Sequence, residues 1–390
     1  MARVLIGWEL GSGLGHALSM RRMGLAIMAR GHQVAFALQR VEALPGGVPK
    51  GSLLLQSPLW PRLLTLAEPG ATKPAVTLVD ILARLGMDTP GCLTAMIGAW
   101  DGIMAGFQPD VVITDFAPAL LIAAQGRVPS IASGPGFQVP PDDVSPLARL
   151  GGDTPGYDET AMLDLIDADL RDAGREPLSK LADLFRCNRR TIASFWELDP
   201  YQRPDSADFI APAIGAWAGP SDSRGNEVFV YANGPLQRYD AFWQGIVAAG
   251  FPVRAHVPLR DQALRDRIAS FGVIVERNPV PWPVIANRSR VAVNHSAHGI
   301  MSALMLAGIP QLALPLDLEK RLHGEALART NLGLVADGHM IERAEITVTV
   351  ERLYHDVDMA GSTRAAATEF ATRMEIPFEA SIADAVDGLI

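Results

Sequence analysis

The sequence predicts an α/β chain with two Rossmann-like, doubly wound domains that face a cleft. Apolar runs of strand length alternate with helical patterns in the first third of the chain, and the alternation starts again after residue 227. Residues 199–227, rich in turn formers, separate the two regions. Such alternation implies right-handed crossovers and parallel sheets, whose ligands bind beyond the carboxyl ends of the strands.

The first domain is expected over residues 1–215. Its elements are predicted in the order strand 3–10, helix 17–30, strand 32–39, strand 109–116, helix 117–126 and strand 128–134. Gly31 is placed to end the first helix, because glycine readily adopts the left-handed conformation that follows a helix. Residues 140–180 are acidic and rich in Pro and Gly. We expect them to pass over the cleft rather than to form a separate domain.

The second domain is expected over residues 216–370, followed by a helical segment at 371–390. Its elements are predicted in the order strand 228–234, helix 238–250, strand 252–258, strand 273–279, strand 291–295, helix 299–308 and strand 310–315. The last helix of this series begins after a turn of small residues that follows His295. Backbone N–H groups at such a helix start form an anion site.

Composition and charge narrow the class of protein. The 390 residues are 48% hydrophobic, 20% charged and 6% aromatic, as in a globular enzyme or binding protein. A net charge of -9 argues against a nucleic-acid partner but allows a small anionic ligand. Cys92 and Cys187 cannot form a disulfide framework. The first apolar run is too short for a signal peptide, and no apolar stretch is long enough to predict a transmembrane segment. We therefore expect a cytoplasmic protein.

The glycine-rich turn after the first strand departs from a dinucleotide-binding fingerprint. Gly11 and Gly13 fit the first two glycines, but His16 takes the place of the third, which packs helix against strand. Glu42, the nearest acid after the second strand, comes late for a ribose contact. An NAD-dependent oxidoreductase is therefore disfavoured.

His16 has two interpretations at this position. A neutral imidazole at a helix start is a competent general base, or the ring caps and packs its own turn. Asp115, at the end of the strand 109–116, shares the same sheet edge and could orient the imidazole as in a catalytic triad. It could equally cap the following helix.

The second half carries motifs that resemble a known family. The stretch "VNHSAHGIMSALMLAGIP" and the N-terminal "GLGHALSMRRMGLAIMARGHQVAFAL" resemble the GT-B nucleotide-sugar glycosyltransferases, the class of the macrolide, plant and glucuronosyl transferases. The family pattern His-Gly-Gly-x-Gly-Thr, then Gly-x-Pro, matches His295, Gly299, Gly308 and Pro310. The resemblance implies that His16 is the catalytic base and Asp115 its partner. It also implies that the last helix crosses back to the first domain.

The donor positions implied by the resemblance are partly changed. Ser296 and Ala297 replace two glycines, Ile300 a phosphate-contacting hydroxyl residue, and Ala303 the ribose-binding glutamate. The sugar-contacting Asp-Gln pair falls on Glu319 and Lys320, and Lys320 suggests a donor with an extra negative charge. The donor contacts expected from the resemblance are His295, Ser296, His298, Gly299, Trp282, Val280, Gly234, Glu319 and Lys320. His323, at a position where the family often has asparagine, is a further candidate.

The resemblance implies an inverting, metal-independent transferase with no cofactor. It would move a sugar from a nucleoside diphosphate, UDP or TDP favoured, to an unidentified small-molecule or glycan acceptor. Apolar groups of the first half would line the acceptor site, with Trp60, Trp100, Phe116, Phe137 and Trp196 as candidates.

Other functions share this fold and stay open. A sugar-nucleotide epimerase or a phosphorylase is one class. A catalytically degenerate protein that binds or activates a partner is another, and the changes at Ile300 and Ala303 favour it. Retention of both His16 and Asp115 argues against it.

Overall fold

The chain forms two compact units. The computed structural model describes residues 1–11, 13–44, 46–63, 75–151, 154–206, 208–221, 225–258, 261–339 and 342–390. The first unit holds residues 1–194, 201–211 and 376–390, and the second holds 195–200 and 212–375. The structure therefore differs from the expected bounds at 195–200, 212–215 and 371–375, which all belong to the second unit.

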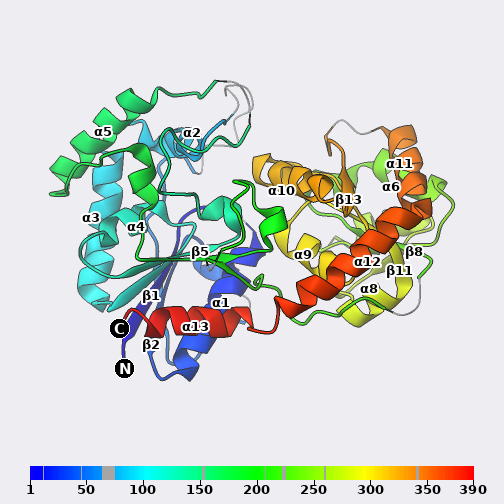
Figure 1. Ribbon diagram of the computed structural model, residues 1–390, viewed down its shortest axis with the longest axis horizontal. Coiled ribbons are helices and arrows are strands. Elements are labelled where there is room, and N and C mark those ends of the chain that lie inside the picture. The colour runs from blue at the N-terminus through cyan, green and yellow to red at the C-terminus, as the bar shows by residue number, and fades with distance from the viewer. Residues whose placement is uncertain are drawn as a thin grey trace. The chain divides into compact units, whose positions relative to one another are not determined.

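The first unit is built on a parallel sheet (Figure 1). Within the described residues it has seven strands, in the order β3-β2-β1-β4-β5-β6-β7. Their bounds are β1 Arg3–Trp8, β2 Gln33–Leu38, β3 Leu53–Gln56, β4 Val111–Asp115, β5 Ser130–Gly134, β6 Arg189–Ala193 and β7 Phe209–Ile210. The central strands β1, β4 and β5 are almost wholly buried, which explains their continuous apolar runs.

Helices cover this sheet and connect its strands. The α-helices are α1 Leu14–Ala29, α2 Leu78–Leu82, α3 Cys92–Phe107, α4 Pro118–Ala124, α5 Glu159–Asp172 and α13 Phe378–Asp387, with a π-helical turn η2 at Ala83–Met87. Short 3₁₀ turns are η1 Val41–Ala43, η3 Gly136–Gln138 and η4 Leu181–Phe185. Gly31, at φ +85°, follows the end of α1 as predicted. The His32 N–H then donates to the Ile27 carbonyl at 3.4 Å, which closes the helix end.

The predicted elements of the first third are confirmed, and the structure adds others. The sequence pattern does not predict strand β3, because its residues are mostly exposed and show no alternation. It does not predict helix α3 either, because Gly98, Gly102 and Gly106 weaken the helical pattern. The segment 140–180 contains α5, which packs against α3. The Asp169 carboxylate of α5 accepts the Gly91 N–H at 2.7 Å and the Leu93 N–H at 2.8 Å, so this part of the segment is anchored to α3.

The second unit contains a second parallel sheet. Within the described residues it has six strands, in the order β10-β9-β8-β11-β12-β13. The strands are β8 Glu227–Tyr231, β9 Val253–His256, β10 Ile274–Glu276, β11 Ser289–Asn294, β12 Gln311–Ala313 and β13 Gly333–Val335. The helices are α6 Asp240–Ala248, α7 Gln262–Ser270, α8 Trp282–Arg288, α9 His298–Leu306, α10 Leu318–Arg329, α11 Arg343–His355 and α12 Val357–Thr372, with 3₁₀ turns η5 Trp196–Leu198 and η6 Gly234–Arg238. The predicted strands and helices of this half are all present, with bounds a few residues away from those expected.

Each sheet has one place where the strand order reverses. In the first unit the chain leaves β1 toward β2 and β3, and leaves β4 in the opposite direction toward β5. In the second unit the same reversal lies between β8 and β11. Loops diverge at such a switch point, so the carboxyl ends of the two strands leave room for a ligand. The loops after β1 and β4, and those after β8 and β11, therefore lie where ligands of such sheets bind.

The last helix, α13, packs against α1 in the first unit (Figure 1). The Arg22 guanidinium donates to the Glu379 carboxylate at 2.6 Å and lies over the Phe378 ring at 5.5 Å from its centroid. Arg30, directly after the end of α1, pairs with Asp384 and Asp387 at 2.7 Å. The C-terminal segment is thus held by one buried aromatic ring and by ion pairs along its length.

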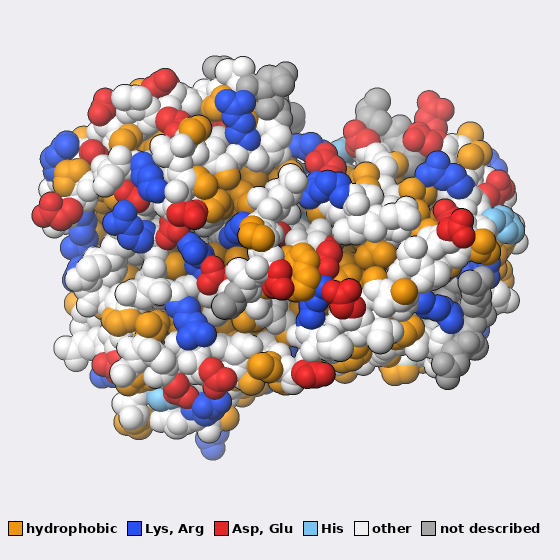
Figure 2. Space-filling model, viewed as in Figure 1, with side chains coloured by type: hydrophobic (Ala, Val, Ile, Leu, Met, Phe, Trp, Pro, Cys, Tyr) orange, Lys and Arg blue, Asp and Glu red, His pale blue; other side chains and the backbone are white. Residues whose placement is uncertain are grey.

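The surface carries charges of both signs. Figure 2 shows acidic and basic side chains interspersed over the face in view. Among the described residues, no helix combines the length and the apolar character needed to cross a bilayer.

We expect Phe378→Ala to destabilise the first unit by about 3–5 kcal/mol, because it removes a ring that is 1% exposed and leaves a cavity between α13 and α1. Ile376→Ala is the matched control, since that side chain is 63% exposed and its loss should cost less than about 0.5 kcal/mol. Urea unfolding followed by amide hydrogen exchange of α1 measures both. Equal effects of the two substitutions would show that the Phe378 ring does not hold α13 against α1.

Candidate functional site

His16 and Asp115 meet at the switch point of the first unit. His16 lies in the first turn of α1, and Asp115 is the last residue of β4. The His16 Nδ1 lies 2.7 Å from the Asp115 Oδ1. Asp115 is 2% exposed. With Asp115 ionised, Nδ1–H donates to the carboxylate and the basic lone pair of the neutral imidazole lies on Nε2.

Asp115 does not cap the helix that follows it. Helix α4 begins at Pro118, and its N-cap is Ala117, which makes no side-chain cap hydrogen bond. The residue after Asp115, Phe116, has φ +49°, an uncommon conformation for a bulky side chain. Its carbonyl accepts the Leu10 N–H at 3.1 Å. This bond joins the chain after β4 to the chain after β1.

Two neighbours position the His16 ring. Trp8, buried at the end of β1, stacks on it with the ring centroids 5.2 Å apart and the planes inclined by 16°. Trp8 is also the register partner of Asp115 in the adjacent strand. Gly11 has φ +86°, and a Cβ at this position would lie 2.2 Å from the His16 Nε2. The glycine of this turn therefore admits the imidazole where a dinucleotide fold would admit pyrophosphate.

Gly11→Ala should displace the His16 ring, because the added methyl group collides with Nε2 and the φ of +86° strains an L-residue. Gly13→Ala is the control: it has φ -81°, and its Cβ would come no closer than 3.8 Å to another atom. We expect the imidazole NMR signals of His16 to change in the first variant and to remain as in the unchanged protein in the second. Unchanged signals in both would mean that Gly11 is not needed to admit the ring.

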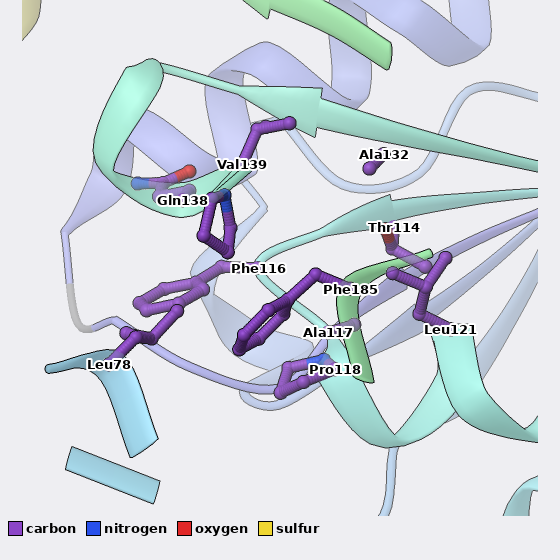
Figure 3. A pocket seen from close by; sticks show the side chains of 11 residues that line it. Leu78, Thr114, Phe116, Ala117, Pro118, Leu121, Ala132, Gln138, Val139 and Phe185 are labelled. Atoms are coloured by element: carbon purple, nitrogen blue, oxygen red, sulfur yellow. The ribbon is translucent and has the colours of Figure 1, made fainter. Parts of the chain in front are cut away.

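An apolar pocket is lined by residues that flank Asp115 along the chain (Figure 3). Thr114 and Ala132, register partners on β4 and β5, contribute to its lining. Asp115 is the next residue along β4, so its side chain points to the other face of the sheet. The remaining lining residues are Leu78, Phe116, Ala117, Pro118, Leu121, Gln138, Val139, Pro140 and Phe185.

The aromatic residues expected around an acceptor do not form one group. Phe116 lines the pocket, and Phe137 contacts it edge to face, with the ring centroids 5.9 Å apart. Trp60 and Trp100 are fully buried and donate hydrogen bonds to Glu9. Trp196 belongs to the second unit, where Arg373 lies over its ring. Among the described residues that line the pocket, none is one of these three tryptophans.

His295 lies at the switch point of the second unit, directly after β11. It is 4% exposed, its ring stacks on Tyr231 at 5.3 Å between centroids, and its Nδ1 lies 3.4 Å from the Tyr231 carbonyl. Burial lowers the pKa of His295 to about 4. The imidazole is therefore neutral at pH 7 and can donate one hydrogen bond without carrying a charge.

Ser296 keeps the backbone shape of the glycine that it replaces. Its φ is +61°, in the left-handed region that glycine favours. The Ser296 N–H donates to the Asn294 side chain at 2.8 Å, which holds this turn. Helix α9 begins two residues later, at His298. The departure from the family pattern at this position thus changes the side chain and leaves the path of the backbone suited to a tight turn.

Several buried polar atoms around this turn make no hydrogen bond of good geometry among the described residues. They are the Ser296 Oγ, the Ser302 Oγ and both ring nitrogens of His323. His323, on α10, is 1% exposed, and its ring centroid lies 5.3 Å from that of His298. Burial lowers the pKa to about 4 for His323, where a weak polar contact with the Ser296 backbone offsets it only in part, and to about 3 for His298. Because unpaired buried polar groups are costly, such a cluster indicates a place for a polar ligand.

The other residues expected to contact the sugar donor also lie in the second unit. Gly234, at φ +60°, starts the turn after β8, and its N–H donates to the Asn233 side chain at 2.8 Å. Trp282 and Val280 are half-buried and pack against apolar clusters, Trp282 as the first residue of α8. Glu319 and Lys320 lie in the first turn of α10. Gly299 is exposed in the first turn of α9.

Two of the changed positions are apolar in the structure as well. Ala303 is 1% exposed and lies in an apolar cluster with Phe195 and Leu306. Ile300 is half-buried against a neighbouring cluster.

The Lys320 ammonium pairs with the Asp317 carboxylate, which also caps α10. Among the described residues, no group of three or more His, Cys, Asp or Glu side chains could hold a metal ion.

His323→Gln tests the burial of this histidine through the pH dependence of stability. Its pKa is about 4 in the folded chain and 6.5 ordinarily, so between these values the unfolded chain binds the proton and the folded chain does not. His323 therefore contributes stability above pH 6.5 that is lost as the pH falls toward 4. We expect the variant to lose less stability than the unchanged protein between pH 7 and about 5. Urea unfolding at both pH values measures this, and a variant with the same pH dependence would contradict it.

Proteins of similar structure match the chain over its whole length, although no protein-family model and no curated protein sequence matches it. The glycotransferase of kitacinnamycin is 17% identical, with 100% of this chain and 99% of that chain covered and a TM-score of 0.69. CalG4, the calicheamicin glycosyltransferase, is 16% identical over 100% and 98%, with a TM-score of 0.69. The glycosyltransferase VinC, in complex with dTDP, is 16% identical over 99% and 98%, with a TM-score of 0.64.

These likenesses extend over nearly the full length of both partners. In this chain two parallel sheets, each with its own switch point, follow one another in sequence order. The resemblance in fold predicted from the sequence is thereby confirmed: the chain has the two-domain Rossmann-like fold of these glycosyltransferases.

Proposed function

We propose that this chain is an inverting glycosyltransferase that moves a sugar from a nucleoside diphosphate sugar to an acceptor hydroxyl, without a metal. The observation that carries the proposal is the hydrogen bond of 2.7 Å between His16 and Asp115 at the switch point of the first sheet. A binding module has no need of an imidazole oriented by a buried carboxylate. A thymidine or uridine nucleotide is the favoured donor, and VinC, one of the similar structures, is in complex with dTDP.

The first unit would supply the base. His16 accepts the proton of the acceptor hydroxyl on Nε2 while the oxygen attacks the anomeric carbon. Asp115 fixes the tautomer and stabilises the imidazolium that forms, since its carboxylate already lies at 2.7 Å from Nδ1. Attack on the face opposite the leaving group inverts the anomeric configuration. The bond from sugar to phosphate breaks, and the nucleoside diphosphate leaves with the electron pair.

The second unit would bind the diphosphate of the donor. The backbone N–H groups at the start of α9 have no partner within the helix and can donate to phosphate oxygens. His295 and His323 are neutral, so they would add hydrogen bonds rather than positive charge. The Ser296 hydroxyl, buried and unpaired among the described residues, would complete its hydrogen bonding on the same ligand. Fixed donors of this kind stabilise the charge that develops on the leaving group.

The sugar and ribose contacts would differ from those of the family pattern. Ala303 cannot bind a ribose diol, and it lies buried in an apolar cluster. Glu319 is the remaining acid for sugar hydroxyls. The Lys320 charge is neutralised by Asp317, which argues against a donor sugar with an extra negative charge.

A degenerate donor site is the second candidate function, favoured by Ala303 and Ile300. A thermal-shift panel of UDP, TDP, GDP, ADP and NAD separates it from the first. A ligand at 100 times its Kd stabilises the folded state by about 2.7 kcal/mol. Stabilisation by a single nucleoside diphosphate supports the transferase and identifies its base. No stabilisation by any of them supports the degenerate protein, and stabilisation by NAD alone contradicts both.

His16→Ala and Asp115→Asn test the base. We expect His16→Ala to lower the rate of sugar transfer by about 10²–10⁴, the usual contribution of a general base. Asp115→Asn should lower it comparably while nucleotide binding is kept, because Asp115 acts through His16. Asp110→Asn is the matched control, because Asp110 lies just before β4 whereas Asp115 ends that strand. The Asp110 carboxylate accepts the Arg3 N–H at 2.8 Å. Turnover of His16→Ala within a few-fold of the unchanged enzyme would refute the assignment.

A further inference from the structure

Glu9 is a buried carboxylate that takes no part in the proposed reaction. It directly follows β1 and is fully buried. Its Oε1 accepts the Trp100 indole N–H at 2.8 Å and the Leu120 N–H at 2.7 Å. Its Oε2 accepts the Trp60 indole N–H at 2.8 Å and the Ala119 N–H at 3.1 Å. One side chain thus binds three segments that are far apart in the sequence.

The chemistry of these partners requires an acceptor on both oxygens. All four groups are neutral N–H donors. If the carboxyl group were protonated, its own O–H donor would face one of these N–H donors, and that hydrogen bond would be lost. Burial raises the pKa of Glu9 to about 7, because the four hydrogen bonds only partly offset the loss of water. Four N–H donors converge on this one buried side chain, where an apolar residue could fill the core, which indicates a role beyond packing.

The residues on either side of Glu9 belong to the candidate active site. Trp8 stacks on the His16 ring and is the register partner of Asp115. Leu10 donates its N–H to the carbonyl of Phe116, the residue after Asp115. Successive side chains of a strand point to opposite faces, so Glu9 faces α3 and α4 while Trp8 faces His16.

Glu9 therefore connects the ends of β1 and β4 on the face of the sheet opposite His16. Ala119 and Leu120 lie in the first turn of α4, four and five residues after Asp115. The Glu9 carbonyl accepts the Gln39 side chain at 2.5 Å, which also ties the end of β2 to this point. The carboxylate and the carbonyl of one residue thus fix the positions of the segments that carry His16 and Asp115.

We propose that Glu9 is a positioning residue for the His16–Asp115 pair: its carboxylate holds the end of β1 against the first turn of α4, so that the imidazole and its partner keep their alignment. This rests on the proposed function in so far as the pair is catalytic. Glutamine at position 9 has one acceptor oxygen and one NH₂ group, so at least two of the four N–H donors lose their partner and face another donor. The strand ends then separate, and an alignment error of about 1 Å can cost about 10²-fold in rate.

Glu9→Gln is compared with Asp169→Asn in the full chain. Asp169 is a matched control, because it is also a buried carboxylate of the first unit that accepts two backbone N–H groups, at the start of α3. Three quantities are measured: the imidazole NMR signals of His16, the kcat of sugar transfer from a UDP or TDP sugar, and the Kd of UDP or TDP. We expect both variants to be less stable. In Glu9→Gln alone, the His16 signals should change and kcat should fall about 10-fold to 10²-fold, with Kd within about twofold.

The outcomes separate this proposal from the proposed function. His16 signals and kcat that stay as in the unchanged protein, despite lower stability, would show that Glu9 is merely structural and overturn the inference. If the unchanged protein transfers no sugar, the proposed function fails, while the NMR comparison still decides whether Glu9 aligns the pair. If Glu9→Gln does not fold, Trp60→Phe removes a single donor and keeps the carboxylate. It should change the same His16 signals in part, and unchanged signals there would also overturn the inference.

Discussion

In both units the strand connections turn in opposite directions on either side of one central pair of parallel strands. This constraint places the loops after β1 and β4 side by side in the first unit, and those after β8 and β11 in the second. His16 and Asp115 are 99 residues apart in the sequence and meet at 2.7 Å because their strands are neighbours there. In the second unit the turn at Ser296 follows β11 and the loop at Gly234 follows β8, the neighbouring strand. Both halves of the proposed reaction, proton removal and diphosphate binding, depend on these two switch points.

Buried polar groups serve two purposes in this chain. Glu9 has two N–H donors on each carboxylate oxygen, so its cluster acts as an internal tie between segments. The Ser296 hydroxyl and the His323 ring nitrogens lack such partners among the described residues. A fold does not keep unpaired polar atoms buried without a reason, and a polar ligand supplies one. This contrast in hydrogen bonding supports the proposal that the second group contacts a ligand.

The departures from the family pattern are of two kinds. Ser296 adopts the left-handed φ of the glycine that it replaces, so the turn survives while a hydroxyl is gained. Ala303 instead removes a polar side chain and lies in an apolar cluster, so a contact is lost. The turn at the phosphate end of the proposed donor site thus keeps its shape, although Ile300 lacks the hydroxyl expected there, and the ribose contact at Ala303 is lost. A transferase of this kind would depend more strongly on its diphosphate contacts for donor binding than the family pattern implies.

Local sequence patterns were enough to predict the alternation of strands and helices, the two successive sheets and the switch-point loops that carry His16, Asp115 and His295. These features follow from hydrophobic periodicity and glycine placement, which act over short stretches of chain. Strand β3, helix α3, the division at residues 195–200 and the hydrogen bonds of Glu9 could not be predicted in this way. They depend on tertiary contacts, because an exposed edge strand lacks a pattern and a glycine-rich helix needs its neighbours for stability. Glu9 is the clearest case, since its partners on Trp60, Trp100 and α4 lie 51 to 111 residues away in the sequence.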